Sequence, residues 1–327
     1  MTTPVIPRNR DGTKLQICIF AHHSIHTLTA NKKAHLFLLI SQVIYAITFV
    51  VAKVLMRDHI GPFALVMLRG LGATPLFWLA DAFFIKEKTD RKDLPRLFLL
   101  CLFGVTINQT LFISGLNLTS PISAAIMMIT TPILVVVVAG FLIREKITWV
   151  RTTGIILGFA GAATLMLNSG LNAGGKEDNP FGDLLIFINA LSWGTYLVLV
   201  KPLMKKYHTI TILRWTFTFS MIFIIPIGFN QLMNVNWESF TPTAYGLLFF
   251  VIFFTTFLAY LLNVYALKEL SPAVVSAYIY LQPVLTAIIA IGTGNDSISG
   301  VKVFSALLIF AGVYLVSNSS TQVKVKE

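Results

Sequence analysis

The sequence predicts an all-α integral membrane protein with ten transmembrane helices, arranged as two inverted five-helix repeats. Composition is the first observation: 56% of the 327 residues are hydrophobic, 12% are charged, and the mean hydropathy is +0.78. A soluble globular protein carries roughly 25% charged residues, so this chain lacks the polar surface that a water-soluble particle needs. Recurring apolar stretches and an internal repeat are the second and third observations.

Ten apolar stretches follow one another from residue 35 almost to the C-terminus. Each is long enough to cross about 30 Å of hydrocarbon as a helix. Prolines stand at or near the start of five of them, where the missing backbone N–H costs least. The connections are short, so neighbouring helices must run antiparallel. The predicted spans are residues 35–55, 62–84, 95–115, 121–143, 148–167, 181–201, 209–229, 242–266, 272–292 and 298–317.

Lysines and arginines gather in alternate connections, which predicts the orientation of the chain. One set of connections holds basic residues within 32–33, 86–96, 144–151, 205–206, 268 and 324–326, whereas the opposite set holds little more than Arg57, Lys176 and Lys302. Cytoplasmic connections carry the excess of positive charge. We therefore expect a multi-pass protein of the cell inner (plasma) membrane with both termini in the cytoplasm. Residues 1–33 are expected to form a disordered cytoplasmic leader, and residues 319–327 a cytoplasmic tail.

An internal repeat relates the two halves of the chain. Pro121 and Pro132 recur as Pro272 and Pro283 at one constant offset. The same offset relates Glu145 to Asp296, Thr148 to Ser299 and Gly161 to Gly312. Because each repeat, residues 34–167 and 181–318, holds five crossings, the second must enter the membrane from the opposite side. Inverted repeats of this kind are typical of secondary carriers, with the substrate site near mid-membrane between the halves.

These features resemble those of the EamA family, part of the drug/metabolite transporter superfamily. The resemblance covers roughly residues 34–318. It is carried by the ten-span plan, the Ser-Pro pairs with a second proline in the fourth and ninth spans, the acidic residue after the fourth span, and the glycine-rich fifth span. Asp296 is a departure, since the family more usually has Glu there. The resemblance implies an inner-membrane carrier of small organic solutes, often an exporter of amino acids or other metabolites.

Other classes of protein are disfavoured by what the spans contain. No span has a central His or carboxylate that could serve an enzyme, so no catalytic residue is expected, and Cys18 and Cys101 have no metal-type spacing. We expect no metal and no cofactor. The basic residues form no continuous face, which argues against nucleic acid. The expected partners are the lipid bilayer and a small-molecule substrate, and the chain is compatible with a monomer.

Charged residues within the spans are the first candidates for a site, because an ionised group there is costly and tends to be functional. Only Lys53, Arg69, Lys201 and Arg214 qualify. The two lysines are expected to snorkel to the headgroups. The deeper arginines either snorkel as well or form an electropositive lining that attracts carboxylate or phosphate. The absence of mid-span Asp or Glu favours facilitated diffusion or exchange, with proton antiport through a loop-end acid as the alternative.

Uncharged polar and aromatic residues of equivalent spans are the other candidates, although any one of them could instead serve interhelical packing. Pro132 and Pro283 are candidate hinges, because a proline inside a helix frees a backbone carbonyl. Gly154 and Gly158 predict close helix packing, and Glu145 and Asp296 predict loop caps or ion pairs. The candidate substrate-binding residues are Tyr45, Arg69, Asn108, Gln109, Thr131, Trp193, Tyr196, Arg214, Asn263, Tyr278, Tyr280 and Gln282.

The expected function is alternating-access export or exchange of small organic metabolites such as amino acids. A nucleotide-sugar or sugar-phosphate exchanger of the same superfamily is the alternative, since an anionic substrate would suit Arg69 and Arg214. A membrane-embedded sensor without transport is an alternative of another class.

Overall fold

The computed structural model describes residues 11–143, 149–171 and 179–323, and in these ranges helices joined by short connections form the structure, with no β-strand. Eight helical stretches are long and apolar enough to cross a membrane, and two shorter apolar helices occupy residues 152–168 and 300–315. Large apolar side chains face outward, among them Phe83 (73% exposed) and Phe141 (82% exposed), as the outer surface of a protein in lipid requires. The protein is therefore an all-α membrane protein.

The helices follow the predicted spans closely, with several spans divided into two or three pieces. The elements of the first half are α1 (Asp11–Asp58), α2 (Pro62–Ala80), η1 (Asp81–Ile85), η2 (Arg91–Asp93), α3 (Leu94–Cys101), η3 (Leu102–Thr106), α4 (Ile107–Leu118), α5 (Pro121–Met128), α6 (Thr131–Ile143) and α7 (Trp149–Leu171). Those of the second half are α8 (Pro180–Leu199), α9 (Lys201–Met204), α10 (Thr209–Met233), η4 (Trp237–Ser239), α11 (Pro242–Phe249), η5 (Phe250–Leu258), α12 (Ala259–Glu269), α13 (Pro272–Ala277), η6 (Tyr278–Tyr280), α14 (Leu281–Gly292) and α15 (Gly300–Val323).

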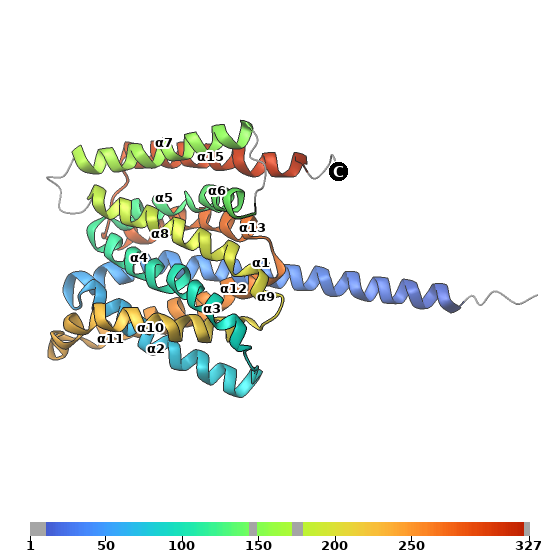
Figure 1. The fold of residues 1–327 in the computed structure, drawn as a ribbon. Helices are drawn as coiled ribbons and strands as arrows, with labels where there is room; N and C mark the ends of the chain where they lie inside the picture. The colour runs from blue at the N-terminus through green and yellow to red at the C-terminus, as the bar shows by residue number, and fades with distance from the viewer. Residues whose placement is uncertain (1–10, 144–148, 172–178, 324–327) are drawn as a thin grey trace, which may run out of the picture.

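The chain before the first predicted span differs from the expected disorder. α1 begins at Asp11 and runs without a break to Asp58, so that its first part projects from the bundle (Figure 1). No proline interrupts this segment, and adding residues to an existing helix costs far less than nucleating a new one. Residues 1–10 of the expected leader lie outside the described residues.

Four helices begin with the same local device, a polar side chain followed by proline. The side chains of Asn179, Ser120, Thr241 and Ser271 each accept a hydrogen bond from a backbone N–H in the first turn of the following helix. Such N-caps satisfy donors that have no partner within the helix, and proline tolerates the first helical position. Pro121, Pro242 and Pro272 are three of the five prolines predicted at span starts, and the other two, Pro62 and Pro95, also lie within the first two residues of α2 and α3.

The two candidate hinge prolines coincide with breaks in their helices. α5 ends at Met128 and α6 begins at Thr131, just before Pro132, while the 3-10 turn η6 separates α13 from α14 just before Pro283. The carbonyl that Pro132 leaves without its helical donor, that of Met128, accepts a hydrogen bond of 2.7 Å from the Thr131 hydroxyl. Both breaks therefore occur where proline removes a helical hydrogen bond.

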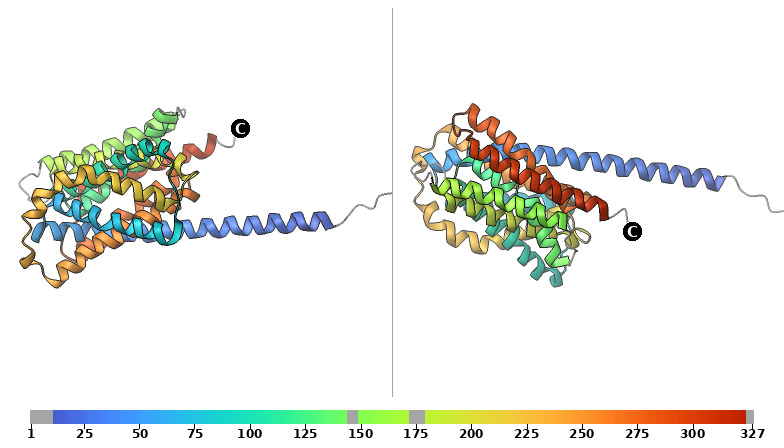
Figure 2. Two further views of the ribbon diagram at one scale, coloured as in Figure 1. Left: turned by 60° about the horizontal axis from the view of Figure 1, so that its bottom comes forward. Right: turned by 90° about the horizontal axis from the view of Figure 1, so that it is seen from above.

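The helices pack in an order that repeats between the halves. The contact of α4 with α8 corresponds to that of α12 with α1, and the contact of α6 with α8 corresponds to that of α14 with α1. Two further contacts pair equivalent helices of the two halves, α2 with α10 and α7 with α15. The α7–α15 pair forms an outer layer, and the other helices form the body beneath it (Figures 1 and 2). The described ends of the chain, in α1 and α15, lie at one end of the bundle, together with α3, α9 and the α12–α13 connection (Figure 1).

Glycines allow the close crossing of α7 and α15. A Cβ atom on Gly312 would lie 2.5 Å from the carbonyl oxygen of Gly154 and 2.7 Å from the backbone nitrogen of Gly158. Any side chain at position 312 would therefore force the two helices apart. This contact confirms the close packing predicted from the glycine-rich fifth span.

Candidate functional site

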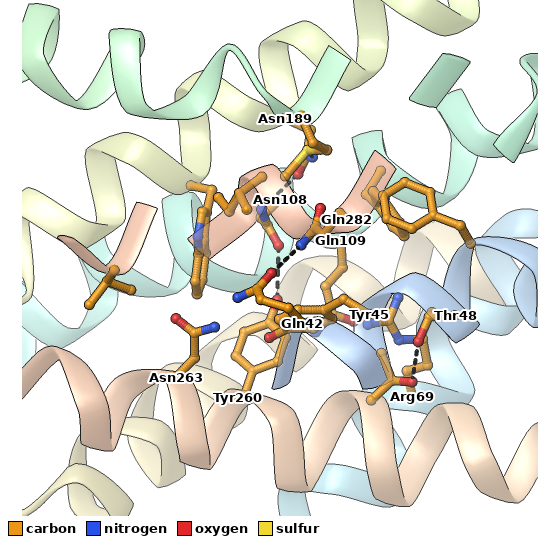
Figure 3. Close-up of a pocket in the computed structure, with 17 residues that line it drawn as sticks. Gln42, Tyr45, Thr48, Arg69, Asn108, Gln109, Asn189, Tyr260, Asn263 and Gln282 are labelled. Atoms are coloured by element: carbon orange, nitrogen blue, oxygen red, sulfur yellow. Dashed lines mark hydrogen bonds between the residues drawn. The ribbon is translucent and has the colours of Figure 1, made fainter. Parts of the chain in front are cut away.

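A cavity lies at the centre of the bundle, between helices of the two halves (Figure 3). The space between its lining residues that protein atoms do not fill is about 620 Å³, a volume that includes open solvent. The first half contributes residues of α1, α2, α4 and α5, and the second half residues of α8, η5, α12, α13, η6 and α14. The lining residues are Gln42, Tyr45, Thr48, Phe49, Arg69, Asn108, Gln109, Phe112, Met128, Asn189, Trp193, Thr255, Tyr260, Asn263, Val275, Ile279 and Gln282.

Hydrogen bonds between amide side chains cross the cavity from one half to the other. Asn108 Nδ2 donates to Asn189 Oδ1 at 2.7 Å, and the Tyr260 hydroxyl donates to Asn108 Oδ1 at 2.8 Å. Gln282 Nε2 donates to Gln42 Oε1 at 2.7 Å (Figure 3). Each of these bonds joins a residue before position 167 to one after position 180. The cavity is therefore a contact between the halves as well as a space.

Several polar atoms of the lining have no partner within the described chain. They are Nε2 of Gln42, both amide atoms of Gln109, Oε1 of Gln282 and Oδ1 of Asn263. A buried polar group without a hydrogen bond costs roughly 1–3 kcal/mol, so native proteins seldom leave such groups unsatisfied. The cavity thus offers both donors and acceptors to a bound solute or to water.

Arg69 of α2 is the charged residue of the lining, and 3% of it is exposed. Its Nε donates to Thr256 Oγ1 at 2.9 Å, while its buried Nη1 has no hydrogen-bond partner in the described part of the chain. Thr256 belongs to η5, a π-helical segment, and its hydroxyl donates in turn to the Val251 carbonyl at 2.7 Å. No carboxylate among the described residues forms an ion pair with Arg69. The guanidinium therefore faces the cavity with unused donors.

Aromatic rings form the apolar part of the wall. Trp193 packs edge-on against Tyr260 with centroids 5.6 Å apart, and Phe49 packs against Phe112 at 5.2 Å. Tyr45 lies between Gln42 and Arg69 (Figure 3). This combination of rings, amides and one cation suits a small solute that has an apolar part and a negatively charged group.

The structure brings seven of the twelve predicted binding residues to the cavity: Tyr45, Arg69, Asn108, Gln109, Trp193, Asn263 and Gln282. The other five have different surroundings. Thr131 bonds the Met128 carbonyl, Tyr196 stacks behind Trp193, the Tyr278 hydroxyl lies 2.7 Å from His35 Nδ1, and Tyr280 packs on Phe310. The fifth is Arg214.

Arg214 is buried at the other end of the α2–α10 contact. It forms an ion pair with Asp81, and its guanidinium lies 4.6 Å from the Trp78 ring and 5.4 Å from the Trp215 ring. The side chains of Arg214 and Asp81 are 7% and 6% exposed. Its charge is therefore neutralised within the protein.

Lys53 and Lys201 differ from the expected snorkelling. Lys53 Nζ donates to the carbonyls of Leu116, Asn117 and Thr119 at 3.1, 2.9 and 2.9 Å, at the end of α4. Helix carbonyls there have no helical donor, and a cation stabilises them. Lys201 Nζ makes the equivalent contacts at the end of α12, with the carbonyls of Leu267, Lys268 and Leu270. The two sets of carbonyls are separated by the same offset as Pro121 and Pro272.

Asp296 confirms the prediction of a loop cap and ion pair. Its carboxylate pairs with Lys302 Nζ at 2.9 Å and accepts a bond of 2.9 Å from the backbone N–H of Ile122, in the first turn of α5. Its counterpart Glu145 lies outside the described residues.

Sequence reasoning missed several lining residues that helical spacing could have found. Gln42 and Thr48 lie three residues before and after Tyr45, Asn189 lies four before Trp193, and Tyr260 lies three before Asn263. Residues three and four apart share a helix face. Searching three and four positions before and after each predicted residue for other polar side chains would have identified these four.

Comparisons with known proteins agree with this architecture. The sequence pattern of the EamA-like transporter family matches residues 32–167 and residues 180–318. An uncharacterized transporter of Archaeoglobus fulgidus is 28% identical over 296 residues, which cover 89% of this chain and 100% of that protein. Protein WALLS ARE THIN 1 of Arabidopsis thaliana is 26% identical over 326 residues, covering 86% of this chain and 82% of that protein.

A bacterial relative and one solved structure add to these matches. The uncharacterized inner membrane transporter YedA of Escherichia coli is 30% identical over 182 residues, covering 52% of this chain and 55% of that protein. A protein crystal structure with 17% sequence identity shares the fold, with a TM-score of 0.58 over 88% of this chain and 97% of the other. Together with the double family match, these similarities show that the chain belongs to the EamA-like transporter family of the drug/metabolite transporter superfamily.

Proposed function

We propose that this protein carries small organic solutes across the membrane by alternating access, with the central cavity as its binding site. The observation that carries the proposal is the cavity itself, which both halves line with polar atoms that have no hydrogen-bond partner among the described residues. The family of transporters to which the chain belongs supports the same function. Movement of the halves relative to each other would open the cavity to one side at a time.

We propose further that residues 34–167 and 181–318 are inverted repeats. Support comes from the two family matches, from the helix contacts that recur between the halves, and from Lys53 and Lys201, which bind equivalent carbonyls. Two similar halves of opposite orientation provide two states of comparable energy, which a carrier needs. The basic connection at residues 86–92 lies at the same end of the bundle as the described chain ends, which supports cytoplasmic termini in an inner membrane.

For the substrate we propose an organic solute with a carboxylate, such as an aliphatic or aromatic amino acid. Arg69 would bind the carboxylate, the oxygens of Gln109, Gln282 and Asn263 would accept bonds from an ammonium or hydroxyl group, and the aromatic wall would contact the apolar part. A nucleotide sugar or sugar phosphate would bring two or more negative charges. The lining supplies one cation, because Arg214 is neutralised by Asp81.

Counterflow in proteoliposomes tests these proposals. We expect accumulation of labelled amino acids by vesicles preloaded with the same compound, and no accumulation of phosphorylated sugars. Movement of phosphorylated compounds alone would contradict the carboxylate proposal. Binding to the purified protein without counterflow of any compound would instead indicate a sensor.

Two cavity variants connect the flux to the site. Arg69→Gln and Gln282→Ala should reduce counterflow while the yield of folded protein stays unchanged. Loss of one cavity hydrogen bond corresponds to roughly 0.5–1.5 kcal/mol, so Gln282→Ala should lower the rate about twofold to tenfold. Arg57→Gln is the matched control, because Arg57 forms an exposed pair with the adjacent Asp58 far from the cavity. Unchanged rates in both cavity variants would remove these residues from the site.

A further inference from the structure

The charge balance of the cavity has a consequence beyond substrate binding. Of the lining residues, Arg69 alone carries a formal charge at neutral pH, and it is almost completely buried. Its one hydrogen bond within the described chain is to Thr256, and its Nη1 has no partner. The other lining residues are amides, hydroxyls, aromatic rings and apolar side chains. The cavity without solute therefore contains one positive charge for which the described part of the chain supplies no counterion.

Arg214 shows that this fold can neutralise a buried arginine. There the guanidinium has the Asp81 carboxylate, two indole rings and the Thr89 hydroxyl around it. The helix that carries Arg69 packs against the helix that carries Arg214, yet the one hydrogen-bond partner of Arg69 within the described chain is the Thr256 hydroxyl. A charge deep in a membrane protein needs a partner, and among the described residues no carboxylate pairs with Arg69, so a bound carboxylate can serve as its counterion.

A carrier must close its cavity to both sides while it changes orientation. With the cavity empty, closure removes water from Arg69 and leaves the charge uncompensated in a medium of low dielectric constant. With a carboxylate bound, closure encloses a neutral pair with charge-assisted hydrogen bonds. The barrier for reorientation is therefore higher for the empty protein than for the loaded one.

We propose, on the basis of the proposed function, that the protein is an exchanger of carboxylate-bearing solutes in which Arg69 suppresses the return of the empty carrier. Each half-cycle then requires a bound carboxylate, whichever side it comes from. Arg69 sets the mode of transport as well as the class of substrate.

Efflux from proteoliposomes tests the mode directly. Vesicles are loaded with labelled phenylalanine or with labelled 3-phenylpropanoate, which lacks the ammonium group. Efflux is then measured into buffer with and without the same unlabelled compound. We expect the external compound to accelerate efflux at least about tenfold, which corresponds to about 1.4 kcal/mol of barrier. Equal efflux in both buffers would contradict the exchange mechanism.

The two probes distinguish recognition of an amino acid from recognition of a carboxylate that has no ammonium group. Exchange of phenylalanine alone indicates an amino-acid carrier, and exchange of 3-phenylpropanoate as well indicates recognition of the carboxylate without the ammonium. Both outcomes agree with the inference. If neither probe nor any other carboxylate in the counterflow panel moves, the proposed carboxylate substrate fails and the inference fails with it, whereas transport of other solutes would stand. Movement without acceleration overturns the inference alone.

Variants at position 69 show whether the charge is responsible. Arg69→Gln removes the charge, so the ratio of exchange to net efflux should fall toward one even though both rates decrease. Arg69→Lys keeps the charge and should keep the ratio well above one. Arg57→Gln should leave both rates and their ratio as in the natural protein. The same ratio in Arg69→Gln as in the natural protein would contradict a role of the charge.

A measurement without substrate covers the case in which Arg69→Gln no longer transports. Val275 lines the cavity, so the thiol of Val275→Cys, in a chain without the two native cysteines, reacts with a membrane-impermeant maleimide only when the cavity is open. Adding the maleimide to one side of the membrane or to the other shows to which side the cavity opens. In the empty protein we expect labelling mainly from one side. Adding Arg69→Gln should allow labelling from both sides. Identical labelling patterns with Arg69 and with Gln at this position would contradict the inference.

Discussion

Two buried arginines of this protein have opposite electrostatic surroundings. Arg214 has a carboxylate and two indole rings, whereas Arg69 has one hydroxyl and an open cavity. Both look alike in the sequence, as single basic residues within apolar stretches. The difference follows from what the neighbouring helix places beside each guanidinium, and it separates a structural residue from a candidate binding residue.

Replacing Arg214 should therefore destabilise the fold. Arg214→Gln leaves the buried Asp81 carboxylate without its partner, a change that typically costs about 3–5 kcal/mol. We expect a corresponding loss in the free energy of unfolding in detergent. Asp81→Asn combined with Arg214→Gln removes both charges and should recover part of that loss. Arg69→Gln, which leaves no carboxylate unpaired, should retain the stability of the natural protein; equal destabilisation by the two single variants would contradict this assignment.

At the scale of the helices, side chains from one element hold the ends of another. Lys53 of α1 binds three carbonyls at the end of α4, and Lys201 of α9 binds three at the end of α12. In each case the next helix begins one or two residues later with a Ser-Pro pair. These contacts fix the turns between the central helices that line the cavity.

Removing either lysine should loosen its turn. Hydrogen bonds to charged groups contribute roughly 1.5–3 kcal/mol, so Lys53→Met should lower the local stability of the α4–α5 connection by at least about that amount. Hydrogen exchange should then accelerate in residues 115–120 and remain unchanged in residues 266–271. Lys201→Met should give the reverse pattern. Acceleration in both connections with either variant would argue against separate contacts.

The N-terminus of α10 should make stability depend on pH. His208 is the N-cap, and its Nδ1 accepts a bond of 3.3 Å from the Ile210 N–H, which a protonated ring cannot do. Burial and the nearby Lys268 lower the pKa of His208 below its usual value of 6.5, against the smaller opposing effects of Glu87 and Asp81. The unfolded chain therefore binds the proton first as the pH falls.

This contribution to stability is complete above about pH 6.5 and is lost as the pH falls through the lower pKa of the folded state. Thermal unfolding measured between pH 8 and pH 5 should show the decline. His208→Asn keeps a capping acceptor that does not titrate in this range, and it should flatten the profile. An unchanged pH profile in His208→Asn would contradict the capping role.

At the scale of the whole molecule, the central property is that the two halves meet across the cavity. Several side-chain hydrogen bonds between lining residues cross from one half to the other, and α2–α10 and α7–α15 pair equivalent helices. A motion of one half relative to the other must break or rearrange the Gln42–Gln282 and Asn108–Asn189 bonds. The same residues that line the site thus join the halves.

Opposite ends of the bundle should face opposite sides of the membrane. In a chain without the two native cysteines, Lys88→Cys and Ser297→Cys place a thiol at exposed positions, one in the basic connection and one before α15. In inside-out vesicles we expect an impermeant maleimide to label the first and not the second, and in intact cells the reverse. Labelling of both from the same side would contradict the inverted arrangement of the halves.

Much of this architecture follows from the sequence, because hydropathy and proline position are local properties of the chain and the internal repeat can be found by comparing the sequence with itself. The predicted spans agree with the helices to within a few residues, apart from the extension of α1. Seven predicted binding residues reach the cavity because they lie on apolar segments where a polar group needs a partner. Four further lining residues, Gln42, Thr48, Asn189 and Tyr260, could also have been predicted, because residues three and four apart are neighbours on a helix face.

The sequence by itself determined the membrane class, the family and the approximate position of the helices. Only the tertiary structure decided that Arg69 faces the cavity while Arg214 meets Asp81, and that Lys53 and Lys201 bind helix ends rather than headgroups. These outcomes depend on contacts between residues more than sixty positions apart. Whether a buried charge is neutralised is a property of the space around it, which helix packing creates.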